Sequence, residues 1–314
     1  MKKAVVTGST GMLALATADR LLNEGYEVIA LVRPGSPRES NIPEDSRIHK
    51  IFLDMKDIGK LPSLLKDQDL ADGIELFFHF AWDGTHGESR NNADIQIENI
   101  RASVEAVRCA AALGCSTFLG AGSQAEYGRV AEGVKLSSGT PVNPITGYGM
   151  GKLAAGKFSR IEAEKLGIKH VWVRILSVYG PFDGLHTMVM SGIGNLLEGR
   201  KASYTKGEQL WDYLYCKDAA KAFYLAAVKG KNNAVYPVGS GRVRPLKDYI
   251  TDIRDAVNPA APLGFGEVDY YPDQVMYLCA DISDLTADTG FEPEYGFSEG
   301  IKETVEWYKE HYVK

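Results

Sequence analysis

The fold is decided by one stretch near the start of the printed sequence, Ala4-Val5-Val6-Thr7-Gly8-Ser9-Thr10-Gly11-Met12-Leu13-Ala14. Its apolar, β-branched beginning predicts a buried strand, and residues 12–23 follow with the period of an amphipathic helix. Gly8 permits the tight turn between them, Gly11 lets a pyrophosphate approach the backbone, and Ala14 is small enough for the helix to pack on the strand. The helix N-terminus then offers free N–H groups to phosphates. The residues expected at the cofactor are Gly8, Thr10, Gly11 and Met12.

Strand-like and helix-like segments alternate after this turn. Apolar or β-branched runs occur at 27–32, 75–80, 117–121 and 170–175, with helical patterns at 95–113 and 146–166 between them. Repeated strand–helix–strand order predicts a Rossmann-type, doubly wound parallel sheet in an α/β fold. Because the glycine turn lies at the first strand-to-helix junction, cofactor binding is favoured, and a purely structural glycine turn remains the alternative.

The regular alternation weakens near residue 180. Beyond it the chain is richer in aromatic and turn residues, with short strands near 202–205, 214–216 and 234–238 and helices near 218–228, 246–257 and 299–311. We therefore predict a dinucleotide-binding domain at 1–180 and a smaller, mixed α/β substrate lobe at 181–314, and the chain can cross back between the two. Such a lobe is expected to cover the carboxyl ends of the strands, where open α/β sheets bind ligands.

Composition excludes several classes of protein. Of 314 residues, 45% are hydrophobic and 24% are charged, which is typical of a folded globular chain. The net charge of -6 gives no reason to expect nucleic acid as a partner. The four cysteines have neither metal-ligand spacing nor the density of a disulfide framework, so no metal site is expected. Without a run of 18 apolar residues, no membrane association is expected and the cytoplasm is the expected compartment.

The end of the second predicted strand bears on the choice of cofactor. Arg33 follows Leu31-Val32, with no acidic residue at this tip, so a 2′-phosphate is better accommodated than a free ribose hydroxyl. NADP is therefore favoured over NAD, with a solvated loop charge as the alternative role of Arg33. Asp54, after the third strand, can accept a hydrogen bond from an adenine amino group or cap the next helix.

A tyrosine and a lysine lie four residues apart in the helix predicted at 146–166. Tyr148 and Lys152 therefore share one helix face, where a cation favours the phenolate and, with an oxidised nicotinamide, can lower the pKa of the phenol toward neutrality. By itself such a pair is often only helix surface. Ser123, at the tip of the strand predicted upstream, supplies the context, because its hydroxyl can bind a substrate oxygen while Tyr148 exchanges a proton.

With these elements the sequence resembles the extended branch of the short-chain dehydrogenase/reductase superfamily, the nucleotide-sugar epimerases, dehydratases and 4-keto reductases. The resemblance extends over essentially the whole chain. It rests on Thr7-Gly8-x-x-Gly11-x-x-Ala14, Asp54, Phe78-His79-Phe80-Ala81, Asn99, Ser123, Tyr127-Gly128, Tyr148 with Lys152, Arg174, Val178-Tyr179-Gly180-Pro181 and Asp212-Tyr213-Leu214-Tyr215 leading to Asp218. It implies that Tyr148 is the acid/base, that Lys152 also binds the nicotinamide ribose, and that Ser123 orients the reacting oxygen. It also implies further cofactor contacts at Phe80, Ala81, Trp82 and Asn99.

Departures from the family pattern bear on the substrate. The 4,6-dehydratases carry an Asp-Glu pair after the Ser/Thr, where this chain has Gln124-Ala125, so dehydration is disfavoured. Trp211 and Tyr271 stand where the epimerases usually have diphosphate-binding arginines, and Ser177 replaces a usual Asn. Substrate contacts are expected at Ser123, Gln124, Ser177, Trp211 and Tyr271. Any phosphates would then depend on Arg200, Lys201, Lys206, Arg242 or Arg244, each of which can equally be a solvated surface charge.

The leading interpretation is an NAD(P)-dependent oxidoreductase or epimerase that moves hydride at a ring carbon, C4, of a nucleotide sugar. It would be a 4-keto reductase or a 4-epimerase and not a 4,6-dehydratase. The alternatives are a reductase of a small, non-nucleotide carbonyl compound and a non-catalytic dinucleotide sensor. A homodimer is expected through the helices at 95–113 and 146–166, because such enzymes commonly pair there.

Overall fold

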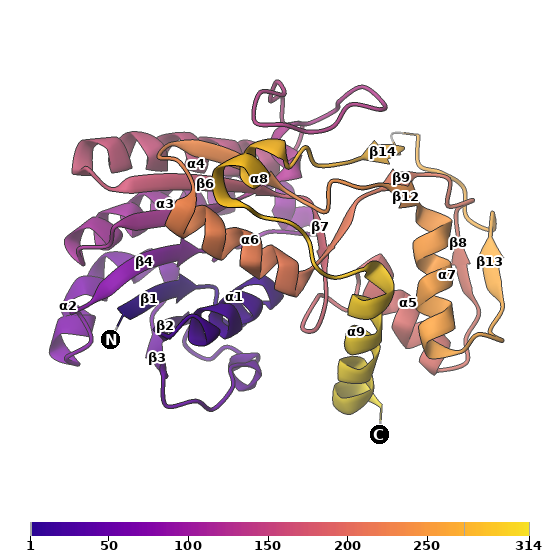
Figure 1. Cartoon of the computed structure of the whole chain (residues 1–314), viewed down its shortest axis with the longest axis horizontal. Helices are drawn as coiled ribbons and strands as arrows, with labels where there is room; N and C mark the ends of the chain where they lie inside the picture. The colour runs from indigo at the N-terminus through magenta and orange to yellow at the C-terminus, as the bar shows by residue number, and fades with distance from the viewer. Residues whose placement is uncertain (1, 273, 314) are drawn as a thin grey trace.

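The central element of the computed structural model is a parallel β-sheet (Figure 1). The structure describes residues 2–272 and 274–313. Within them, seven strands are ordered β11-β6-β5-β4-β1-β2-β3, and each pairs in parallel with its neighbour. The strands are β1 (Lys2–Thr7), β2 (Tyr26–Val32), β3 (Ile48–Phe52), β4 (Ile74–His79), β5 (Thr117–Ser123), β6 (Lys169–Ile175) and β11 (Ala234–Val238). The predicted Rossmann-type sheet is thus confirmed.

Helices cover both faces of this sheet. Val6 of β1 belongs to a core shared with α1 (Met12–Asn23) and α6 (Cys216–Lys229). Its neighbour Val5 points to the opposite face and belongs to a second core. That core includes residues of α2 (Leu61–Asp67), α3 (Ala93–Ala112) and α4 (Gly147–Leu166). Because successive side chains of a strand point to opposite faces, a strand buried on both faces reads as a continuous apolar run, as 4–7 does.

The smaller lobe lies beyond the carboxyl ends of the central strands and occupies the right side of Figure 1. Its short strands pair as β10 with β7, as β12-β9-β14 and as β13 with β8. The strands are β7 (Ser177–Tyr179), β8 (Ala202–Tyr204), β9 (Leu210–Trp211), β10 (Tyr213–Tyr215), β12 (Arg244–Pro245), β13 (Leu263–Phe265) and β14 (Tyr277–Leu278). The helices are α5 (Met188–Leu197), α7 (Leu246–Val257) and α9 (Phe297–Tyr312), while α8 (Ser283–Thr289) packs near α6.

Two elements differ from their expected places. We assigned the helix near 218–228 to the lobe, but α6 packs against α1 and the central sheet. We assigned 234–238 to the lobe, but the structure has it as β11, which pairs with β6 at the edge of the central sheet. The chain therefore crosses back over the sheet through α6 before it returns to the lobe. Pro237 fits this position, because proline cannot donate a ladder hydrogen bond and is tolerated in edge strands. Tyr236 and Val238 of β11 are fully buried against the sheet.

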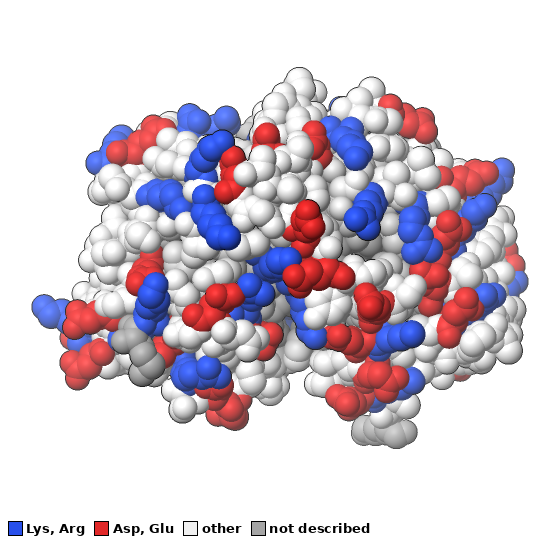
Figure 2. All heavy atoms as spheres, in the orientation of Figure 1, with Lys and Arg blue, Asp and Glu red and all other residues white. Residues whose placement is uncertain are grey.

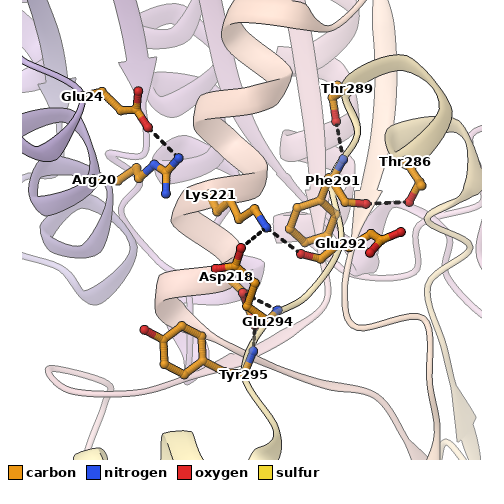
Figure 3. A network of polar contacts seen from close by, with 10 residues as sticks. All are labelled: Arg20, Glu24, Asp218, Lys221, Thr286, Thr289, Phe291, Glu292, Glu294 and Tyr295. Atoms are coloured by element: carbon orange, nitrogen blue, oxygen red, sulfur yellow. Dashed lines mark hydrogen bonds and ion pairs between the residues drawn. The ribbon is translucent and has the colours of Figure 1, made fainter.

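Two buried carboxylates bind the lobe to the central domain. Asp218 in α6 accepts hydrogen bonds from the backbone N–H groups of Glu294 and Tyr295, both at 2.9 Å (Figure 3). Asp212 accepts from the backbone N–H groups of residues 240, 241 and 280. A carboxylate that receives several backbone N–H bonds joins segments far apart in sequence without leaving its own charge unpaired. Both carboxylates therefore hold segments of the lobe against the central domain.

Several glycines of β5 and α4 make room for one tryptophan. A Cβ at Gly120, Gly122 or Gly156 would lie less than 3 Å from the Trp172 indole. Glycine in a helix costs roughly 1 kcal/mol relative to alanine, so α4 is held by this packing and not by helix propensity. Gly156 of α4 thus faces Trp172.

The surface gives no sign of a polyanion site on the side that Figure 2 displays, since lysines and arginines are interspersed with acidic side chains. In the described part of the chain, no helix combines the length and apolar character needed to cross a bilayer. Within the same residues, no three His, Cys, Asp or Glu side chains are grouped so that they could hold a metal ion.

Candidate active site

The turn from β1 to α1 has the geometry expected of a phosphate-binding loop. Gly8 has a φ of 69°, which glycine adopts without strain, and a Cβ there would lie 2.9 Å from the Ala81 backbone nitrogen. Gly11 is the N-cap of α1, and no described side chain caps this helix or adds a carboxylate to its first turn. The first N–H groups of α1 are therefore available to an anion, which fits the pyrophosphate of a dinucleotide.

The loop after β4 is fixed to this turn. The Thr7 hydroxyl oxygen accepts hydrogen bonds from the backbone N–H groups of Phe80 and Ala81, both at 3.1 Å. Asn99 in α3 accepts from the Asp83 N–H and donates to the Asp83 carbonyl oxygen, so it holds the loop from the other side. The predicted cofactor residues after β1 and after β4 thus lie close together. Asn99 contributes by binding the backbone of the loop at Asp83.

Two residues expected at the adenosine end lie near the tips of β2 and β3. Arg33 is 58% exposed in its side chain and forms an ion pair with Asp83 at 3.4 Å. The sequence showed no acidic residue at this tip, because Asp83 comes from the loop after β4. Asp54 caps the short helix η2 (Met55–Lys60) by accepting from the Lys56 N–H, which is the alternative that the sequence left open. The Thr10 carbonyl oxygen accepts a hydrogen bond from Asn41.

Ser123, Tyr148 and Lys152 converge at the carboxyl end of β5. Ser123 is the last residue of β5, and Tyr148 stands in the first turn of α4, where Thr146 caps the helix by accepting from the Gly149 N–H. Lys152 is buried, and its Nζ donates to the Ala121 carbonyl oxygen at 2.6 Å. The sequence placed a hydroxyl, a phenol and an ammonium at this edge of the sheet, and the structure has them there.

Trp82 completes this group of side chains. Its ring lies 3.8 Å below the Lys152 Nζ and meets the Tyr148 ring edge-on at a centroid distance of 6.1 Å. The indole N–H donates to Gln96 at 2.9 Å, which fixes the ring. We expected Trp82 to lie along the cofactor, and its observed contacts are with the two catalytic candidates.

Burial is the main cause of the pKa shifts of Tyr148 and Lys152. Burial raises the pKa of Tyr148 above its ordinary value, while hydrogen bonding to Ser123 and the charge of Arg90 oppose this change. Burial also lowers the pKa of Lys152 to about 7, against the attraction of Glu126. In the protein alone, therefore, the phenol is held protonated. An oxidised nicotinamide, if bound beside the phenol, would add a positive charge that lowers the pKa of Tyr148.

The short helix η4 (Gln124–Glu126) is fixed to β5 by a buried carboxylate. Glu126 accepts hydrogen bonds from the Ser123 N–H at 2.9 Å and from the Trp172 indole at 3.0 Å. Its other oxygen pairs with Arg174 at 2.8 Å, and both side chains of this ion pair are almost fully buried. The resemblance included Arg174 without a role. Its structural role is to neutralise the carboxylate that orients Ser123.

A cleft of about 480 Å³ opens next to the catalytic candidates, because Gln124, Ala125 and Thr146 line it. Ser123, Tyr148 and Lys152 themselves are not among its described lining residues. One wall comes from residues 124–136 and the other from residues 272–278, excluding 273, with Trp211 from β9. Much of the wall is apolar, with Val130, Val134, Leu136, Val275 and Leu278 among its members. Arg90 and Arg129 also line the cleft, and neither was singled out from the sequence. Arg90 lies in a stretch without any motif, so no sequence signal pointed to it.

The expected substrate residues are distributed unevenly around this cleft. Gln124 and Trp211 line it. Ser177 accepts a hydrogen bond from the Trp211 indole at 2.8 Å, so the two departures from the family pattern contact each other. Tyr271 is 77% exposed and is not among the described residues that line the cleft.

Three of the five basic residues suggested as phosphate ligands form ion pairs with acidic side chains. Arg200 pairs with Glu198, Lys201 pairs with Glu267, and Arg244 pairs with Asp252 at 2.8 Å. Arg242 lines a separate hollow near Asp281, and Lys206 is not among the described residues of the cleft. Among the described residues, the charged side chains that line the cleft are Arg90, Arg129 and the acidic Glu132.

A seven-stranded parallel sheet with a glycine turn after its first strand defines a Rossmann-type α/β protein. The chain belongs to the NAD dependent epimerase/dehydratase family, whose family model matches residues 4–239. The resemblance identified from the sequence is thereby confirmed.

Curated relatives are similar over different lengths. The dTDP-glucose 4,6-dehydratase of Shigella flexneri is 26% identical over 180 residues, which are 54% of this chain and 49% of that protein. A trifunctional UDP-glucose 4,6-dehydratase/UDP-4-keto-6-deoxy-D-glucose 3,5-epimerase/UDP-4-keto-L-rhamnose-reductase of Arabidopsis thaliana is 24% identical over 324 residues. That match covers 99% of this chain and 47% of that protein. The chain therefore spans about half the length of the curated relatives it matches.

Solved structures share the fold over nearly the whole chain. UDP-glucose 4-epimerase from Thermotoga maritima, solved with UDP-glucose, gives a TM-score of 0.86 at 22% identity and covers 98% of this chain and 99% of its own. UDP-N-acetylglucosamine 4-epimerase from Methanobrevibacter ruminantium M1, solved with UDP-N-acetylmuramic acid, gives 0.86 at 23% identity and covers 98% of each chain. At these identities the likeness establishes the fold, including the lobe.

Proposed function

We propose that this chain is an NAD(P)-dependent oxidoreductase that moves hydride at C4 of a nucleotide sugar, as a 4-keto reductase or as a 4-epimerase. The observation that carries the proposal is the convergence of Ser123, Tyr148 and Lys152 beside a cleft, at the same sheet edge as the phosphate turn. Several relatives and structural neighbours are named for 4-epimerisation or dehydration of nucleotide sugars. Their shared fold supports the same substrate class here.

The residues of the site have distinct parts in this reaction. The bound nicotinamide supplies the hydride chemistry. Tyr148 donates its phenolic proton to the substrate oxygen in reduction and takes the hydroxyl proton in oxidation. The Ser123 hydroxyl, which interacts with the phenol, orients that oxygen. When protonated, Lys152 favours the phenolate from its buried position on the Ala121 carbonyl oxygen.

The proposal excludes 4,6-dehydration, although relatives in the family perform it. Gln124 and Ala125 follow Ser123 and carry no carboxyl group. The next acid, Glu126, is buried and its two oxygens already receive donors from Ser123, Trp172 and Arg174. Elimination needs an acid and a base in addition to Tyr148, and this carboxylate is committed to holding η4 and β5 together.

NADP is proposed as the preferred cofactor, because the Arg33 guanidinium is exposed at the tip of β2 and can exchange its partner Asp83 for a 2′-phosphate. Five structural neighbours are described in complex with NAD, so direct titration of both cofactors is required.

A homodimer is proposed through α3 and α4. Ile97 on α3 and Phe158 and Ile161 on α4 are apolar and between 43% and 57% exposed. Apolar side chains exposed on adjacent helices favour association. Sedimentation of the native chain and of Phe158→Glu tests this, since the variant should sediment as a lighter species.

A reductase of a small carbonyl compound is the second candidate. It is favoured by the apolar cleft wall and by the absence of an arginine at position 211. The first experiment is a thermal-shift screen with UDP-, dTDP-, CDP- and GDP-sugars in the presence of NADP, because a ligand of the native state raises its melting temperature. Sugars that bind are then followed by NMR at C4.

Tyr148→Phe is the matched control, which should abolish turnover and leave cofactor affinity nearly unchanged. Retention of more than a small fraction of the native rate would contradict the proposed role. Cofactor that remains bound through gel filtration supports the epimerase, and cofactor that is lost supports the reductase. Binding of small carbonyl compounds without any nucleotide sugar would favour the second candidate.

A further inference from the structure

The cleft wall brings a cation onto the ring of Tyr148. The Arg90 guanidinium carbon lies 4.4 Å from the centroid of the phenol ring, closer than the Lys152 Nζ at 5.8 Å. Arg90 is half-buried and also lines the cleft. A guanidinium over an aromatic face is attracted by the ring and limits its rotation.

The backbone around Arg90 is built onto the start of α4. Asn91, in the short helix η3 (Glu88–Asn91), accepts a hydrogen bond from the Gly147 N–H at 2.9 Å. A Cβ at Gly147 would lie 3.1 Å from the Asn91 Cα and 3.2 Å from the Arg90 carbonyl oxygen, so only glycine allows this approach without a shift. The segment that carries Arg90 is therefore fixed directly beside the residue that precedes Tyr148.

The side chain of Arg90 is also held. Its Nη1 donates to the Thr85 carbonyl oxygen at 2.8 Å, which stabilises the guanidinium over the ring. Gln96 donates to the carbonyl oxygens of Gly84 and Arg90 and accepts from Trp82. The same amide thus connects the loop of Arg90 to the indole that meets Tyr148 from another side.

We propose that Arg90 is a positioning residue for Tyr148, which fixes the phenol ring at the cleft and stabilises its phenolate form. No motif suggested this role, and it rests on the proposed part of Tyr148 in proton exchange. The charged groups near the phenol are Arg90 from η3, Lys152 from α4 and Glu126 from η4, with the neutral hydroxyl of Ser123 from β5. Glu126 is paired with Arg174, and Lys152 is bound to the Ala121 carbonyl oxygen. Of the two cations, Arg90 lies closer to the ring of Tyr148.

The test measures the ionisation of the phenol and not turnover. Fluorotyrosine is incorporated at position 148 alone, and fluorine NMR follows its titration in the protein saturated with NADP. An opposite charge at this separation lowers the pKa of an acid by about 1 to 3 units. Since Arg90 is half-buried, Arg90→Gln should raise the titration midpoint by about one unit. The glutamine keeps a donor for the Thr85 carbonyl oxygen, and Arg90→Lys, which keeps the charge, should restore most of the native midpoint.

The control is Arg101→Gln, which removes an arginine on the exposed side of α3. It should leave the midpoint unchanged. Equal midpoints in the native protein and Arg90→Gln, with both folded by circular dichroism, would overturn the inference. If Arg90→Gln fails to fold, the titration of Arg90→Lys decides. Because lysine keeps the positive charge, a titration midpoint about one unit above the native value in this variant would also overturn the inference. An inactive protein whose phenol still responds to Arg90 would instead refute the proposed function and retain the inference.

Discussion

Trp211 donates its indole N–H to the hydroxyl of Ser177 across 2.8 Å, which joins the start of β7 to β9 at the edge of the cleft. The Trp211 carbonyl oxygen also accepts from the Tyr249 hydroxyl at 3.0 Å, so the residue is held from two sides. An indole fixed in this way offers the cleft a stacking face and little else. Any negative charge on the substrate therefore has to find its partners elsewhere in the wall, where Arg90 and Arg129 lie.

Cofactor choice should follow Arg33. Arg33→Asp removes the guanidinium from the tip of β2 and should shift preference from NADP toward NAD. Because the side chain is 58% exposed, we expect a loss of about 1 kcal/mol in NADP binding, roughly fivefold in affinity. Calorimetric titration with both cofactors measures it.

Asp83→Asn is the matched variant for this experiment. It removes the ion-pair partner of Arg33 and leaves the arginine in place, so NADP binding should tighten. Native protein that binds NAD at least as tightly as NADP, with Arg33→Asp unchanged, would show that Arg33 has no part in cofactor choice.

The Glu126–Arg174 pair should matter for stability as well as for the site. Glu126→Gln leaves the buried Arg174 without its counter-charge, and breaking a buried pair in this way costs about 3–5 kcal/mol. Chemical denaturation should show that the free energy of unfolding decreases by about this amount. A removal of both charges, Glu126→Gln with Arg174→Met, should be less destabilising than the single change. If the single variant is as stable as the native chain, the pair is not the buried link that its geometry indicates.

The pH dependence of stability should reflect His79, which lies between Thr7 and Ser103 under the active site. Burial lowers the pKa of His79 to about 3, with Lys152 adding to the effect. In the unfolded chain a histidine has a pKa near 6.5, so below that pH the unfolded state binds more protons than the folded state. The free energy of unfolding should therefore fall as pH decreases from about 6.5 toward 3, by up to about 1.4 kcal/mol per pH unit.

His79→Gln removes this titration and keeps hydrogen-bonding capacity. The variant should be less stable than the native chain at neutral pH but should have a shallower slope between about pH 6.5 and 5. Parallel curves for native and His79→Gln would contradict the lowered pKa.

Local sequence patterns sufficed for the parts of the fold that local physics determines. The run at 4–7 with its glycine turn predicted the first β–α unit, and the spacing of Tyr148 and Lys152 predicted a shared helix face. The strand at 234–238 was misassigned because its partner β6 lies about sixty residues earlier in the chain. The local pattern of apolar residues does not indicate which distant strand a segment pairs with.

The candidate site also combines residues that local motifs predict with residues that only tertiary packing brings there. Ser123, Tyr148 and Lys152 could be identified because they sit in motifs, whereas Arg90 could not, since its importance depends on how η3 docks on Gly147. The pairing of Arg33 with Asp83 likewise joins residues fifty positions apart. Contacts of this kind arise from tertiary packing and leave no pattern in the surrounding sequence.

The last prediction concerns the position of Trp211 itself. Trp211→Arg breaks the hydrogen bond to Ser177 and places a guanidinium in the cleft wall, where a planar, charged group can pair with a phosphate. A hydrogen bond to a charged group contributes about 1.5–3 kcal/mol, and the partly exposed position favours the lower end. UDP or dTDP should therefore bind roughly tenfold more tightly to the variant by calorimetry. Trp211→Phe, which keeps a ring and loses only the indole N–H, should bind these nucleotides about as the native chain does. Tight nucleotide binding by the native chain that is unchanged in Trp211→Arg, and that survives alanine at Arg200, Lys201, Lys206, Arg242 and Arg244, would instead assign the phosphate contact to the Arg90 and Arg129 side of the cleft.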